Sequence, residues 1–107
     1  MKWLKDVLTA KNRRLFLAVE GNDVKRLEAL LRKGVNPDER GQNGGTALHL
    51  AASLGNSEIV DLLLSKAASP TCTDDAGGTA IDLALDKAFF SIASTILHSG
   101  GTFHSEH

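Results

Sequence analysis

The chain has 107 residues, of which 42% are hydrophobic and 23% are charged, and its formal net charge at pH 7 is −1. This length accommodates one domain with a thin but continuous core, and the single cysteine excludes an intramolecular disulfide framework and is typical of a reducing compartment. Because no stretch has the length of a membrane span or the pattern of a signal peptide, we expect a cytoplasmic protein without a membrane partner, with the nucleus as the alternative compartment.

The first residues carry apolar side chains at helical spacing, at Trp3, Leu4, Val7 and Leu8. This spacing predicts a short lid over residues 1–7 that closes the exposed end of the domain. A membrane anchor is the alternative, but about two helical turns offer little apolar area for that. The basic run "KNRR", Lys11–Arg14, follows. It is typical of a solvated helix start, and a nuclear-import or phosphate-contacting patch is the alternative.

An internal repeat covers the rest of the chain. The stretch "GGTALHLAASLGNSEIVDLLL", Gly44–Leu64, matches "GGTAIDLALDKAFFSIASTIL", Gly77–Leu97, with every landmark displaced by 33 residues and no gap. The same step backwards places leucines and alanines of residues 15–31 in register. A fixed period of this length predicts stacked supersecondary units, each unable to bury its apolar face alone. The predicted units are 8–40, 41–73 and 74–106.

Each unit contains signals for two short helices and an extended loop. A threonine N-cap, Thr46 or Thr79, precedes the first helix, which in the middle unit extends to about Leu54 and includes Leu50 in its apolar side. Gly55 and the following asparagine end it, and a second apolar stripe predicts an antiparallel helix. The polar run "AASPTCTDDAGG" then predicts an extended finger. The side chains predicted to lie in the core are those of Leu48, Ile59, Leu63 and Ile81.

The middle unit resembles the ankyrin repeat, because it follows the family pattern G-x-T-x-L-H-x-A-A-x-x-G-x-x-E-I-V-x-L-L-L. The resemblance implies an all-α solenoid of stacked antiparallel helix pairs joined by finger loops. It also implies that His49 hydrogen-bonds backbone of the adjoining finger, and that the chain is a non-catalytic module that binds a protein through its finger tips and the exposed side of each first helix. The partner-binding residues carried over in this way are Arg40, Gln42, Asn43, Ser53, Leu54, Thr73, Asp75, Ala76, Asp86 and Lys87, with Gly45 and Gly78 beside them. Only Arg40 and Leu54 in this set resemble the anchors of strong interfaces.

The third unit departs from the family pattern. It has Asp82 where the middle unit has His49, and Ala88–Phe90 where the middle unit has Gly-Asn-Ser. This unit is therefore expected to be a degenerate C-terminal cap whose turn between helices is displaced or lacks the glycine geometry. We expect at least Phe89 to fold inward, with a monomeric chain as the result. The alternative is an architectural role, in which this unit self-associates or packs against a further domain.

No set of residues in the chain predicts catalysis, so we expect no enzyme activity and no cofactor. Cys72 falls on a finger without a pairing base, and the turn glycines lack the lysine of a phosphate-binding loop. His98, His104 and His107 gather near the end, but the tail has no framework to fix metal ligands, so no metal site is predicted.

Charge is divided between the two parts of the chain. Residues 1–40 hold ten Lys and Arg against six Asp and Glu, a balance of +4, whereas residues 41–107 hold two against seven, a balance of −5. The acidic part argues against a nucleic-acid partner and would suit a protein partner with a basic patch.

Overall fold

The computed structural model of the chain describes residues 10–41 and 43–100. The predicted lid, Gln42, His104 and His107 therefore lie outside the described residues. The helices come in three antiparallel pairs: α2 (Ala10–Glu20) with α3 (Val24–Arg32), α4 (Ala47–Leu54) with α5 (Ser57–Ser65), and α6 (Ala80–Asp86) with α7 (Phe90–His98). The described residues contain no strand. The predicted all-α class is confirmed.

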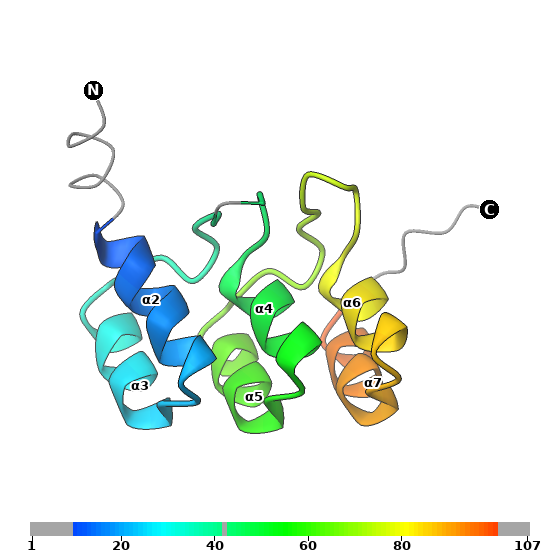
Figure 1. The fold of residues 1–107 in the computed structure, drawn as a ribbon. Helices are drawn as coiled ribbons and strands as arrows, with labels where there is room; N and C mark the ends of the chain where they lie inside the picture. Colours follow the sequence, from blue (N-terminus) through cyan, green and yellow to red (C-terminus); the bar gives the residue numbers. More distant parts are fainter. Residues whose placement is uncertain (1–9, 42, 101–107) are drawn as a thin grey trace.

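The three pairs stack side by side in two layers (Figure 1). The first helices, α2, α4 and α6, form one layer and contact one another in sequence, and α3, α5 and α7 form the other. A finger loop projects between α3 and α4 and another between α5 and α6. The predicted stack of helix pairs joined by fingers is therefore confirmed, and both fingers extend on the side where α4 and α6 begin.

The core runs through all three pairs. The side chains of Leu48, Ile59, Leu63 and Ile81 are 0–1% exposed, as predicted. Ala51 and its neighbour Ala52 are fully buried where α4 contacts α2 and α6. Small side chains at these positions let neighbouring helices approach closely, so a thin layer of aliphatic side chains fills the interior.

Each pair turns through one residue in the left-handed region, and these residues are 33 positions apart. They are Asn22 with φ 53°, Gly55 with φ 78° and Ala88 with φ 62°. The expectation that the turn of the third unit is displaced or lacks the glycine geometry is wrong. Ala88 holds the same backbone conformation as Gly55, at the strain that a Cβ atom adds there.

In the second and third pairs, the residue after the turn reaches back to the preceding pair. The Asn56 Nδ2 donates to the Val19 carbonyl oxygen at 3.1 Å. The equivalent residue in the third unit, Phe89, packs against the core, and a Cβ atom added to Gly55 would lie 2.9 Å from its Cζ. The predicted inward packing of Phe89 is confirmed, whereas Phe90 is 67% exposed. The third unit lacks the glycine-asparagine pair of the second unit, and an aromatic contact from Phe89 takes the place of the asparagine hydrogen bond.

His49 connects the second unit to the third. The Thr46 amide donates to His49 Nδ1 at 3.0 Å, which makes Nδ1 an acceptor and assigns the ring proton to Nε2. Nε2 then donates to the Gly78 carbonyl oxygen of the next finger, also at 3.0 Å. The role that the family resemblance implied for His49 is confirmed. In the third unit Asp82 caps the Thr79 amide at 2.8 Å instead.

Exchanging the residues at two equivalent turns should have opposite effects on stability. Ala88→Gly should raise the free energy of unfolding by about 1 kcal/mol because it removes a Cβ atom from a left-handed residue. Gly55→Ala should lower it by at least about 1 kcal/mol, because the same strain is added and the new Cβ meets Phe89. Urea denaturation followed by far-UV circular dichroism measures both. Equal signs for the two changes would contradict the proposed strain at Ala88.

Replacing His49 by alanine should loosen the contact between the second and third units. The free energy of unfolding should fall by about 1–3 kcal/mol, because the buried Thr46 amide and the Gly78 carbonyl each lose a partner. Ser65→Ala is the matched control, since it removes one exposed hydrogen bond within α5. A loss no larger in His49→Ala than in this control would show that the histidine contacts contribute nothing to the stack.

Candidate functional site

The two fingers have the same backbone hydrogen bonds at equivalent positions. The Gly41 amide donates to the Gly45 carbonyl at 2.7 Å, and the Asp74 amide donates to the Gly78 carbonyl at 2.9 Å. Gly44, with φ 77°, turns the chain at the tip of the first finger. The left-handed conformation favours glycine here, and a Cβ atom on Gly44 would also lie 2.2 Å from the Asp75 Oδ1 and displace that exposed carboxylate.

The fingers are also bonded to each other. The Asp75 amide donates to the Asn43 carbonyl at 3.1 Å. The Arg40 Nη1 donates to the Gly44 carbonyl at 2.7 Å and to the Thr73 carbonyl. The structure therefore brings together four residues predicted from the resemblance, which are Arg40, Asn43, Thr73 and Asp75, with exposed Ala76 following them in the second finger. One nitrogen of the Arg40 guanidinium is already engaged by backbone, which the sequence did not indicate.

The other predicted residues form a second cluster at the C-terminal ends of α4 and α6. Ser53 donates to the Leu50 carbonyl at 2.9 Å, and the Leu54 side chain is 46% exposed. Asp86 and Lys87 occupy the equivalent positions at the end of α6 and are exposed. Because α4 has eight residues, this cluster lies about 12 Å along the helix from the base of the fingers. The predicted set is thus divided into two groups.

A row of leucines connects these two groups. Leu17, Leu50 and Leu83 are equivalent residues of α2, α4 and α6, and Leu50 shares a face of α4 with Ser53 and Leu54 because they are three and four residues apart. Leu17 is 57% exposed, and the other two are half-buried. The sequence interpretation placed Leu50 in the apolar side of its helix, and this is confirmed, because the half-buried Leu50 side chain packs against the core. The row could have been predicted from the sequence, because a leucine recurs there every 33 residues.

These parts together form one surface, which we call the finger–helix surface. It consists of the finger residues Arg40, Asn43, Thr73, Asp75 and Ala76, the leucines Leu17, Leu50 and Leu83, and the helix-end residues Ser53, Leu54, Asp86 and Lys87. It offers a shallow apolar strip with charged and polar side chains at both ends. Such an arrangement suits contact with another macromolecule better than enclosure of a small molecule.

The described part of the chain holds neither a cluster of metal-ligating side chains nor a membrane-spanning helix. Residues 10–41 and 43–100 contain no group of three or more His, Cys, Asp or Glu side chains placed to hold a metal ion. Across the same residues, no helix is both long and apolar enough to cross a membrane. Cys72 is a free, half-buried thiol on the second finger.

Comparison with known protein families matches residues 15–106 to ankyrin repeats, in three copies. A search of curated proteins found no match. The three copies agree with the three helix pairs, and repeats of this kind are generally protein–protein interaction modules and typically non-catalytic. Since the matched region covers most of the chain and the observed helix pairs and fingers have the expected order, the chain belongs to the ankyrin-repeat family.

Proposed function

We propose that this chain binds a protein partner through the finger–helix surface and has no catalytic activity. The observation that supports this most directly is the bonding between the fingers, in which the Asp75 amide and the Arg40 guanidinium join adjacent units. Fingers held in this way need little ordering when a partner binds, and lower ordering costs favour affinity. Gln42, which lies outside the described residues, remains a predicted member of the surface.

The partner proposed for this surface carries a basic patch beside an apolar side chain. Asp75 and Asp86 are exposed at its two ends, and the third unit is acidic overall, with Asp74 and Asp82 as well. Charges at such rims steer association more than they increase affinity. The apolar contact would come from Leu54 together with the leucine row. Arg40 contributes through the order that it imposes on the fingers.

We further propose that the chain acts as a monomer in the cytoplasm, with the nucleus as the alternative, and that neither nucleic acid nor membrane is its partner. The single cysteine supports a reducing compartment. The negative balance of residues 41–107 disfavours contact with a polyanion along the length of the stack.

Capture from a native lysate tests the proposed surface. Leu54→Ser should weaken capture of the partner by about five- to tenfold through loss of an apolar anchor. Asp86→Lys should weaken it further at low salt, because it reverses a charge facing the partner's basic patch. Ser65→Lys and Ser94→Lys, on the outer helices α5 and α7, are the matched controls and should retain the same proteins. If the outer-helix changes were the damaging ones, the finger–helix surface would not be the binding site.

A second candidate function is self-association through the C-terminal apolar face, formed by Leu85, Phe90 and Leu97. These side chains are exposed, whereas Val19 and Ala52, equivalent to Leu85, are fully buried. Exposed apolar patches mark contacts or aggregation.

Light scattering at several concentrations distinguishes the two candidates. A constant monomer mass is expected under the proposed function. A mass that rises with concentration, and returns to the monomer value in the double variant Phe90→Ser/Leu97→Ser, would favour self-association instead. Since the Phe90 side chain is 67% exposed and that of Leu97 is 45% exposed, this double change should leave the fold intact.

A further inference from the structure

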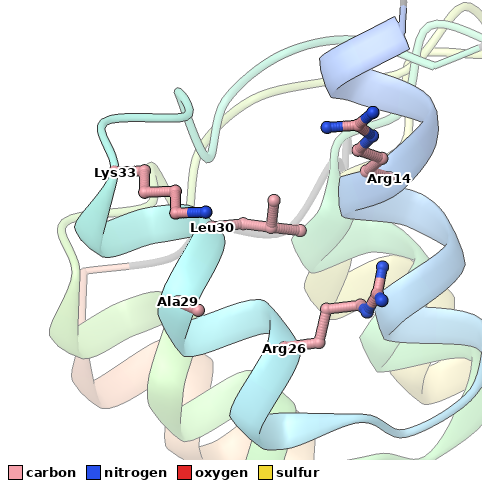
Figure 2. A pocket seen from close by; sticks show the side chains of 5 residues that line it. All are labelled: Arg14, Arg26, Ala29, Leu30 and Lys33. Atoms are coloured by element: carbon pink, nitrogen blue, oxygen red, sulfur yellow. The ribbon is translucent and has the colours of Figure 1, made fainter.

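A hollow lies between α2 and α3 of the first unit, and none of the residues that line it belongs to the finger–helix surface. It has a volume of about 520 Å³ and is lined by Arg14 of α2 and by Arg26, Ala29, Leu30 and Lys33 of α3 and its C-cap. Figure 2 shows the Arg14 side chain on α2 opposite those of Arg26 and Lys33, with Leu30 between them. The floor is apolar and the rim carries three cationic groups.

Equivalent positions in the next two units show what normally covers this face. Leu30 is half-buried, whereas its equivalents Leu63 and Ile96 are completely buried. Ile96 is buried even though no unit follows it among the described residues. Burial at this position therefore depends on the preceding unit. The hollow is the stacking face of the first unit, and no preceding unit covers it in the described part of the chain.

Two of the cations replace residues that are apolar in the other units. Arg14 is equivalent to Ala47, and Arg26 is equivalent to Ile59, both of them 0% exposed. A terminal repeat needs a polar outer face for solubility. Solubility alone is served by interspersed charges of both signs. Here the charged residues lining the hollow are cations only.

These cations are largely unneutralised within the described residues. The Arg26 Nε lies 3.9 Å from the Asp23 carboxylate, a long and exposed contact. The side chains of Arg14 and Lys33 make no ion pair or hydrogen bond with any described residue. Glu28 on the same helix is directed to Arg32, which does not line the hollow. Positive charges around an apolar floor favour a ligand that carries both acidic and apolar groups.

We propose that this hollow binds an acidic peptide segment of a partner protein, independently of the finger–helix surface. A large apolar side chain of the segment would pack on Leu30 and Ala29, where a preceding unit would otherwise stack. Its carboxylates would pair with Arg14 and Arg26, whose guanidinium groups accommodate carboxylates in two parallel hydrogen bonds, and with Lys33.

The composition of the site favours this ligand over two others. Nucleic acid would use the cations but gain nothing from an aliphatic floor, and no aromatic side chain lines the hollow for bases to stack on. The predicted lid, residues 1–7, is the other candidate for this end of the stack, but its Lys2 and Lys5 against Asp6 give a positive balance that does not complement a cationic rim. A peptide that combines acidic and apolar residues matches both features.

The probe is a fluorescein-labelled synthetic peptide in which glutamates flank one tryptophan and one leucine, and its binding to the full chain is followed by fluorescence polarisation. Arg14→Gln, Arg26→Gln and Lys33→Gln should each weaken binding by about two- to fivefold, and the double change Arg14→Gln/Arg26→Gln should weaken it by about tenfold. Arg32→Gln, on the same helix, and Lys66→Gln, equivalent to Lys33 in the second unit, are the charge-matched controls and should leave it unchanged. Circular dichroism confirms that each variant is folded.

Binding of altered probes to the same chain tests the identity of the ligand. Peptides with glutamine for glutamate, or serine for tryptophan and leucine, should each bind more weakly than the probe. Failure of the full chain to bind the probe, or equal weakening by Arg32→Gln, would overturn the proposal. So would an oligonucleotide of equal charge that binds as tightly, which would identify a general anion patch. The variants Leu54→Ser and Asp86→Lys should keep the probe bound, so this result is independent of the finger–helix surface.

Discussion

The structure depends on the fact that no helix pair in this chain can bury its own apolar side chains. Two short helices leave one face of aliphatic residues toward each neighbour, and only stacking at a fixed displacement covers both faces. The displacement of 33 residues, read directly from the sequence, is therefore a physical requirement as well as a pattern. It fixes which positions are interior, such as Ile59 and Leu63, and which lose part of their cover when a neighbour is missing, such as the half-buried Leu30.

The same displacement builds the candidate site. Left-handed residues at Gly55 and Ala88 return each second helix along the first, so the fingers emerge on one side of the stack. Arg40 then bonds the first finger to the second, and His49 bonds α4 to the second finger, in both cases through backbone carbonyl oxygens. Since these contacts use backbone acceptors, they are insensitive to the identity of most finger side chains. The exposed finger residues can therefore differ between units without loss of the bonds that maintain the geometry of the fingers.

Most of the fold could be predicted from the sequence, because its signals are local. Threonine caps, the break at Gly55 and the apolar stripes act within one or two helical turns, and Leu48 and Ile81 are buried as expected. Less of the candidate site could be predicted from the sequence. The engagement of the Arg40 guanidinium depends on Thr73, 33 residues away. Ala88 was misjudged because sequence preference for glycine is a matter of about 1 kcal/mol, which packing of Phe89 against the preceding turn can offset.

Each end of the stack has one face that no neighbouring unit covers within the described residues, and the two faces differ in composition. This difference bears on function. At the first unit, arginines occupy positions that are alanine and isoleucine in the second unit. This uncovered face is therefore polar enough to contact water, but its positive charges are concentrated in one place. At the third unit, Leu85, Phe90 and Leu97 remain exposed, and the nearby charge is mainly acidic. A chain that is basic at one end and acidic along the rest can engage partners of opposite charge at separate surfaces. Because the units contact only their neighbours, binding at the first unit can influence the second and third units through the contacts of α2 with α4 and of α3 with α5.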